Sequence, residues 1–144
     1  MKKFFTILIV IILIIIATVT YNYNSYKTKV LRTQKQNKEY ETLAEGEILG
    51  TSLITIINKA VDSNEKNNIK KDDKNKYIEN DTTSIKIEVK FLEAENIIPM
   101  ENIQKLGSEQ FIKNYAVMNF KCIKKEYHSK TNNIKYMLFE QISY

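Results

Sequence analysis

Residues 4–20 read FFTILIVIILIIIATVT, and this stretch decides how the chain is organised. It follows Lys2 and Lys3 and contains no charged residue, no glycine and no proline. As a helix it is about 26 Å long at roughly 1.5 Å per residue, slightly less than the ~30 Å hydrocarbon core of a bilayer. Backbone polar groups in lipid must bond to one another, so we expect a helix here despite the many β-branched residues.

Tyrosines follow the apolar run at positions 21, 23 and 26. Aromatic rings with a polar edge gather at the headgroup boundary of a membrane, where they mark the end of a span. Residues 1–26 are therefore predicted to form a single-pass membrane anchor, with the lipid bilayer as its partner. The residues assigned to this anchor are Phe4, Ile9, Ile12, Ile16, Val19, Tyr21, Tyr23 and Tyr26.

A cleaved signal peptide is the alternative for this segment, because a short basic start and an apolar stretch are also its marks. Cleavage requires small residues in an Ala-x-Ala-like arrangement, whereas residues 17–21 read ATVTY. No cysteine follows to accept a lipid. We favour the uncleaved anchor.

The flanking charges give opposing signals for membrane orientation. Lys2 and Lys3 favour a cytoplasmic N-terminus, but the other flank is also basic, and the positive-inside rule counts both flanks. A short basic start before a long apolar run is typical of a signal-anchor, so we predict a cytoplasmic N-terminus and a C-terminal domain outside the cell membrane. The opposite orientation stays open because of Lys27, Lys29, Arg32, Lys35 and Lys38.

Composition limits what the remaining chain can do. The 144 residues include 22 basic and 17 acidic ones, and lysine supplies nearly all of the positive charge. Base readout in nucleic acids usually uses arginine, so this composition favours a solvated cationic surface over nucleic-acid binding. The one cysteine, Cys122, cannot form an intramolecular disulfide, so packing must stabilise the domain.

The chain after the anchor is predicted to begin with a polar helical stalk over residues 27–47 and to continue as one domain over residues 48–144. An amphipathic helix is expected over residues 49–61, where apolar residues recur on one face. Thr51 or Ser52 could cap its start. Gly46 and Gly50 have membrane dimerisation spacing but lie far from the apolar run, so we interpret them as a helix junction or a close approach of backbone to sheet. The apolar face comprises Leu49, Leu53, Ile56, Ile57 and Ala60, widened by Ile54 and Val61.

Residues 62–76 are almost entirely polar and are expected to form a loop or hairpin. They alternate oxygen ligands as a calcium loop does, but lysines occupy ligand positions and the final glutamate is missing, so no calcium site is predicted. Residues 84–91 then alternate apolar and polar side chains, which predicts a half-buried antiparallel strand. Residues 77–79 are expected to pair with this strand as a hairpin.

The last third of the chain predicts two short helices and two strands. Pro99 suits the first turn of a helix, and Gly107 is expected to separate it from a second. Strands are expected over residues 117–127 and 134–142, joined as a hairpin through a polar turn. The second of these is apolar on both faces around residues 136–139, which indicates a central position. The predicted fold class is α+β, with the helix of residues 49–61 packed on an antiparallel sheet of about four strands.

Candidate catalytic groups are few, and none forms a recognisable constellation. His128 is the one histidine and is expected to be solvated in a turn. Cys122 is about 20 Å away along an extended strand and is expected to face the core with Met118 and Phe120. Glu93 and Glu95 resemble an acid–base pair, but solvated carboxylates are far commoner. We therefore predict no catalytic, metal or cofactor-binding residue, while a tyrosine-lined binding face stays open.

A long N-terminal hydrophobic helix that leads into a polar stalk, followed by an amphipathic helix on a sheet, resembles the plan of type IV pilins and pseudopilins. In that family a basic leader ends at glycine and is followed by Phe-Thr-Leu-Ile-Glu. Here Phe5-Thr6-Ile7-Leu8-Ile9 follows Phe4, so Phe4 replaces the glycine and Ile9 the glutamate. No functional residue is therefore carried over. The Lys, Asn and Ile-rich composition also resembles membrane-anchored proteins of low-GC Gram-positive bacteria.

These features favour a non-enzymatic, membrane-anchored interaction module in envelope or pilus-like assembly, with protein partners in the membrane or envelope. One alternative is an accessory subunit of a larger membrane complex, with its domain on the cytoplasmic side. An envelope enzyme is a third, although it requires convergent polar groups that the sequence does not display.

Overall fold

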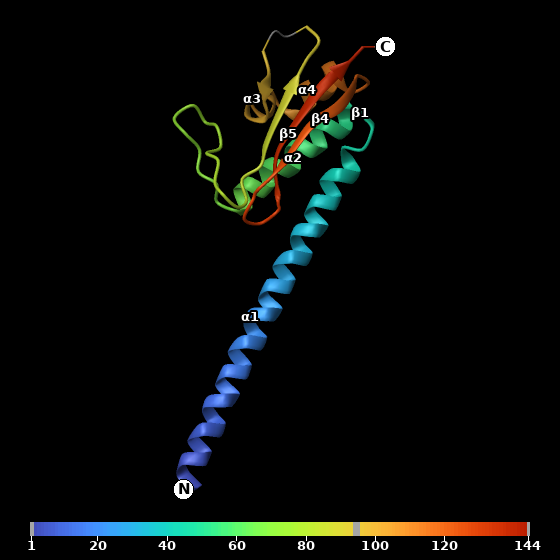
Figure 1. The fold of residues 1–144 in the computed structure, drawn as a ribbon. Helices are drawn as coiled ribbons and strands as arrows, with labels where there is room; N and C mark the ends of the chain where they lie inside the picture. The colour runs from blue at the N-terminus through green and yellow to red at the C-terminus, as the bar shows by residue number, and fades with distance from the viewer. Residues whose placement is uncertain (1, 94–95, 144) are drawn as a thin grey trace. The chain divides into compact units, whose positions relative to one another are not determined.

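The computed structural model describes residues 2–93 and 96–143 (Figure 1). The chain divides into two compact units, with the division between Lys35 and Gln36. The first helix, α1 (Lys2–Leu43), begins in the first unit and ends in the second. The sequence predicts a stalk over residues 27–47 and a domain that starts at residue 48.

The apolar run forms a helix, as predicted. In the first unit its side chains are exposed on all sides, and none of the most hydrophobic window is buried. Two threonine hydroxyls inside this stretch are satisfied locally. Thr18 donates to the carbonyl groups of Ile14 and Ile15, and Thr20 donates to that of Ile16. The apolar helix therefore shelters its own polar groups, which a helix in lipid requires.

The second unit contains a five-stranded sheet in the order β1-β4-β5-β2-β3. β4 and β5 form an antiparallel hairpin, and β5 lies in the centre, as the sequence predicted for both. The two outer strands, β1 and β3, are very short, so the sequence shows no alternation of apolar and polar residues that would predict them. The bounds are β1 (Glu47–Leu49), β2 (Lys86–Lys90), β3 (Ile98–Pro99), β4 (Asn119–Tyr127) and β5 (Ile134–Ile142).

The α+β fold class is confirmed, but the sheet is mixed and has five strands, where an antiparallel sheet of about four strands was predicted. β2 pairs in parallel with β5, with Lys86 opposite Tyr136 and Lys90 opposite Glu140. The alternation that predicted β2 identifies its buried face but says nothing about the direction of its partner. A parallel pair needs a long crossover, and α3, α4 and β4 lie between these two strands in sequence.

The hairpin expected between residues 77–79 and the following strand is also wrong. Tyr77 forms an isolated bridge with Lys71 instead. The side chain of Asn80 accepts hydrogen bonds from the backbone N–H groups of Thr82, Thr83 and Ser84, so residues 80–84 form a tight turn. The edge of β2 is thereby left for β3, which pairs with it at Glu88 and Val89.

Helix α2 (Gly50–Lys66) confirms the predicted amphipathic helix and extends it beyond Val61 to Lys66. The predicted stripe is buried except for Leu49, which is exposed in β1. Neither Thr51 nor Ser52 caps the helix, because Leu49 occupies the N-cap position without a side-chain hydrogen bond. Figure 1 shows α2 crossing one face of the sheet. The helix split predicted at Gly107 is confirmed by α3 (Met100–Leu106) and α4 (Ser108–Tyr115).

The core lies between the helices and one face of the sheet. Phe91 joins its aromatic part, with ring centroids 4.7 Å from Tyr115, 5.9 Å from Phe120 and 6.4 Å from Phe111. The side chains that are fully buried come from α2, α3, α4 and the three longest strands. They include Leu53, Ile56, Ile57, Ile87, Val89, Met100, Phe111, Phe120, Met137 and Phe139.

Gly50 marks a close approach of the backbone to Tyr115 at the end of α4, whereas one of the two predictions for the glycine pair was an approach to the sheet. Its N–H donates to the carbonyl oxygen of Met118 at 2.9 Å. A Cβ at this position would lie 1.9 Å from the carbonyl oxygen of Tyr115, a distance that no packing tolerates. The position therefore admits glycine alone, and it joins the start of α2 to the segment that leads into β4.

Candidate functional site

The residues assigned to the membrane anchor all lie on α1 in the first unit and are all exposed. Their exposed fractions range from 46% at Ile12 to 75% at Tyr21. Exposed apolar side chains lie on all sides of the helix and not along one stripe. A single neighbouring helix or sheet could therefore cover only part of this apolar surface. It is one candidate membrane span in the described part of the chain, by length and composition.

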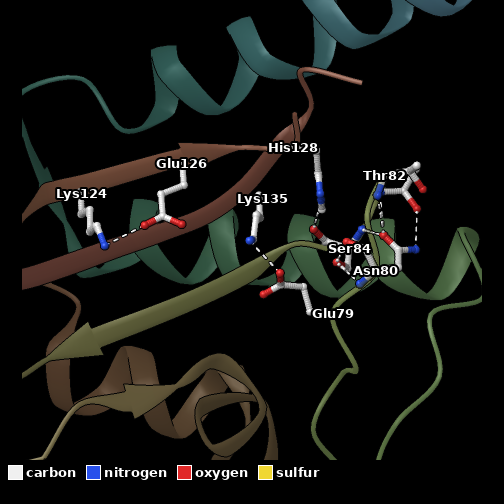
Figure 2. A network of polar contacts seen from close by, with 9 residues as sticks. Glu79, Asn80, Thr82, Ser84, Lys124, Glu126, His128 and Lys135 are labelled. Atoms are coloured by element: carbon white, nitrogen blue, oxygen red, sulfur yellow. Dashed lines mark hydrogen bonds and ion pairs between the residues drawn. The ribbon is translucent and has the colours of Figure 1, made fainter. Parts of the chain in front are cut away.

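His128 is buried, so the expectation of a solvated turn histidine is wrong. Its Nε2 atom lies 2.7 Å from the carbonyl oxygen of Ser84 (Figure 2). Its own backbone N–H and C=O bond to Asn133 and Asn132 across the turn between β4 and β5. The partner at Ser84 is distant in sequence, which is why a local turn pattern could not reveal the burial.

A polar network fixes the segment from Asn80 to Ile85 on both sides, and Figure 2 shows the contacts of Asn80 with Thr82 and Ser84 inside this segment. Thr131 and Asn133 both donate to the carbonyl oxygen of Thr82, at 2.6 and 3.0 Å. Asn64, fully buried on α2, donates to the carbonyl oxygen of Ile85 and accepts from its N–H, each at 2.8 Å. The network satisfies backbone groups of an irregular segment, so its role is to hold the start of β2 in place.

The end of α1 is held in the second unit by a similar amide clamp. The side chain of Asn37 donates to the carbonyl oxygen of Asn132 at 2.6 Å and accepts from the N–H of Ile134 at 3.0 Å. Tyr40 is buried on the same helix, and Ala44 is buried in the turn that follows it. Burial is the main cause of the raised pKa of Tyr40, with a contribution from nearby Glu39 and Asp62. Its hydroxyl therefore remains neutral at physiological pH.

The uncovered face of the sheet carries charges that neutralise one another. The ring of Tyr136 lies within 5.8 Å of the Lys86 ammonium and 5.6 Å of the Lys124 ammonium, and its hydroxyl donates to Glu88. Burial acts to raise the pKa of Glu88, but hydrogen bonds from Lys86 and Tyr136 outweigh it and lower that pKa. Lys124 in turn pairs with Glu126, as Figure 2 shows. The charged groups around Tyr136 on this face are therefore paired with one another.

A groove of about 590 Å³ separates the last turns of α1 from β4, entirely within the second unit. Its volume lies in the range of roughly 300–1,000 Å³ typical of ligand pockets. Both of its walls carry charged or polar residues, and Cys122 is among the residues that line it. The lining residues are Lys38, Glu41, Thr42, Ala44, Glu45, Gly46, Lys121, Cys122 and Lys125.

Cys122 is half-buried and packs against the core, beside buried Phe120, as predicted for both. Met118, expected on the same face, is exposed because it precedes the start of β4. Burial raises the pKa of the Cys122 thiol despite the positive charge of Lys125. The thiolate is the nucleophilic form, so Cys122 contributes a neutral, apolar surface to the groove.

The remaining candidate groups do not assemble into a reactive centre in the described residues. Glu93 is exposed, and Glu95 lies outside the described residues. Within residues 2–93 and 96–143 there is no group of three His, Cys, Asp or Glu side chains that could hold a metal ion. The groove itself combines three lysines and two glutamates around its opening.

Sequence reasoning missed the groove because it depends on tertiary structure. The groove lies between α1 and β4, beyond the end of β1, which has only three residues. The end of so short a strand produces no recurring pattern of apolar residues in the sequence. The lysines at 121 and 125 were visible only as part of a strand. These two lysines lie on either side of a bulge between Cys122 and Lys124, and both line the groove. A bulge inserts one extra residue into the strand, so the alternation of side chains in the sequence cannot reveal it.

Comparisons with models of known families, with curated proteins and with solved structures found no match. The likeness to type IV pilins therefore extends only to the single long apolar helix at the N-terminus.

Proposed function

We propose that this protein is a membrane-anchored, non-enzymatic interaction module that presents the unit of residues 36–144 at the surface of a membrane. The observation that carries the proposal is the apolar helix of residues 4–20, whose side chains are exposed on every side. Exposing such a surface to water is strongly unfavourable, because each buried CH₂ group stabilises by about 0.8 kcal/mol. A bilayer covers all sides of the helix at once.

A binding role is supported by how the potentially reactive groups are used. The Nε2 atom of His128 lies within hydrogen-bond distance of the Ser84 carbonyl oxygen. The Cys122 thiol donates to the Lys124 carbonyl oxygen. Both side chains therefore serve the packing of β4 and its turn. The polar groove beside β4 offers instead a surface for a partner.

The proposed location of the module is the outer side of the cell membrane, with the N-terminus in the cytoplasm. Support comes from the short basic start at Lys2 and Lys3 before the long apolar run. Envelope or pilus-like assembly is the proposed setting, since a single apolar helix joined to a compact unit suits lateral packing in a membrane. Phe4 and Ile9 replace the pilin glycine and glutamate, so processing and assembly would follow a different chemistry.

Protease accessibility in intact protoplasts tests the proposed location. The unit of residues 36–144 should be degraded by external protease in intact cells, while a cytoplasmic marker survives. Protection in intact protoplasts and degradation only after lysis would contradict the outward placement. A detergent-treated sample controls for intrinsic resistance of the folded unit to protease.

A second candidate function is favoured by one specific observation. Five basic residues lie between Tyr26 and Glu39, and such a flank is typical of the cytoplasmic side of a span. The protein would then be an accessory subunit of a larger membrane complex with an inward-facing domain. Removing these charges by Lys27→Gln and Lys29→Gln would change the accessible side of the membrane only if this flank sets the orientation.

A further inference from the structure

The edge of β4 is only partly covered. On one side β4 pairs with β5 along its whole length, whereas on the other side β1 covers only Asn119 to Lys121. In the described part of the chain no strand pairs with that side of residues 122–127. An open edge of this kind presents a row of backbone N–H and C=O groups that an added strand can bond.

The groove lies beside the point where β1 ends and the open edge begins, because Lys121 is the last residue of β4 that β1 pairs with, and Cys122 and Lys125 follow it in the groove. Lys121, Cys122 and Lys125 form its β4 wall, and the last turns of α1 form the opposite wall. At one end it reaches Gly46, immediately before β1. A segment that continues the row of β1 would therefore lie between an edge strand and a helix, which is the geometry that domains use to bind peptides by strand addition.

The charges in the groove point to the nature of the occupant. Lys38, Lys121 and Lys125 form no ion pair with a carboxylate in the described residues. Six lysines elsewhere in that part of the chain do form one. The two glutamates of the groove, Glu41 and Glu45, leave a net positive wall, and Glu41 is already bonded by the Tyr127 hydroxyl at 2.7 Å.

The same lysines argue against a second copy of this chain as the occupant. Two β4 edges placed side by side would bring their lysines together, and edge lysines are a common device against such pairing. A segment with carboxylates at alternate positions would instead place them next to these ammonium groups.

We infer that the groove between α1 and β4 binds an extended, acidic segment of a partner protein, which adds to the free edge of β4 in line with β1. This inference rests on the proposed function, since it names the class of partner that an anchored module would recruit. The backbone edge supplies affinity for any extended chain, and the three lysines select for acidic side chains.

The sole cysteine allows the inference to be tested on the full chain in detergent micelles. The probe is the synthetic peptide acetyl-Thr-Glu-Val-Glu-Val-Glu-Thr-amide. Occupancy of the groove should slow alkylation of Cys122 by iodoacetamide about fivefold or more and should protect the backbone amides of residues 122–127 from hydrogen exchange. Raising the salt concentration should weaken both effects, because the lysines are exposed.

Two control peptides separate the contributions of backbone and charge. A peptide with lysine in place of each glutamate should not bind, and an acidic peptide with proline in place of each valine should lose protection of the edge because proline cannot donate. The double variant Lys121→Glu and Lys125→Glu should weaken binding of the acidic peptide by about tenfold or more. Its matched control is Lys105→Glu with Lys113→Glu, which makes the same charge change on α3 and α4 outside the groove.

The inference is overturned if the acidic peptide leaves Cys122 alkylation and the exchange of residues 122–127 unchanged, or if the lysine peptide binds equally well. Protection that grows with protein concentration in the absence of peptide would identify a second copy as the occupant and would likewise overturn it. These results are independent of the membrane proposal. A chain that stays in the membrane but ignores the peptide contradicts only the strand-addition site, whereas a freely soluble chain contradicts only the anchor.

Discussion

Two isoleucine-rich helices in this protein have opposite surroundings. In α2 the apolar residues recur on one face, so Ile56 and Ile57 are fully buried against the sheet while Thr55 and Asn58 face outward. In the first unit the apolar residues of α1 surround the helix, and Ile12 is 46% exposed. The residue types are the same, so their spacing determines whether a helix packs on a sheet or needs an apolar environment on all sides.

The comparison also shows that β-branched residues do not decide between helix and strand by themselves. Both helices contain several isoleucine and valine residues, yet both are helical, because the surroundings of each helix override the strand preference of these residues. The substitutions below test whether the free energy of unfolding of the second unit and the insertion of the apolar helix into a membrane can be changed independently.

The largest effect is expected from Gly50→Ala, which acts on the second unit alone. The new Cβ would overlap the carbonyl oxygen of Tyr115, and backbone must move to relieve it. We expect the free energy of unfolding to fall by about 4 kcal/mol or more. Urea unfolding of the full chain in micelles measures this change.

The matched control is Gly46→Ala, where no atom lies within 4 Å of the added Cβ. There only the positive φ of 67° opposes the substitution, so the loss should be about 1 kcal/mol. If both substitutions lowered the free energy of unfolding by the same amount, the close contact between Gly50 and Tyr115 would be contradicted.

A smaller effect, on a different property, is expected from Ile12→Arg. A charge at the centre of a membrane helix raises the free energy of insertion by about 3–4 kcal/mol relative to isoleucine. The membrane-bound fraction of the chain should fall, while urea unfolding of the second unit should not change. Thr55→Arg, on the exposed face of α2, provides a control for the added charge, and a shift of similar size in that variant would remove the distinction between the two helices.

The pair Ile57→Ala and Ile12→Ala makes the same chemical change in both helices. Ile57 is fully buried, so its truncation should destabilise the second unit by about 3 kcal/mol through lost transfer energy and a cavity. Ile12→Ala should leave unfolding of that unit unchanged, because its side chain contributes nothing to that core. Unfolding curves recorded in the same detergent decide between these outcomes.

The smallest effect is expected from Glu88→Gln, and it depends on pH. The pKa of Glu88 is lowered in the folded state, so its ion pair with Lys86 stabilises above the ordinary glutamate pKa and is lost as the pH falls through the folded value. At neutral pH the variant should be less stable by about 0.2–1 kcal/mol, and the difference should vanish in acid. A difference that grows on acidification would contradict the lowered pKa.

The sequence predicts the local helices and strands well, but it predicts poorly which segments distant in sequence pair or contact one another. The patterns of α2, β2 and β5 indicate which side chains are buried, because alternation and helical spacing report the faces of an element. The parallel direction of β2 against β5 and the burial of His128 both depend on residues far along the chain, such as Ser84. β1 and β3 are too short to show a period, and the groove exists only because β1 ends early.

The most direct test of the account is whether the intact chain resides in lipid. Membranes from cells that express the full-length protein are washed with alkaline carbonate and then extracted with detergent. We predict that the full-length chain, with residues 4–20 still attached, stays in the washed membrane and is released only by detergent. Recovery of the protein in the carbonate wash, or of a shortened chain that lacks this stretch, would contradict the membrane anchor.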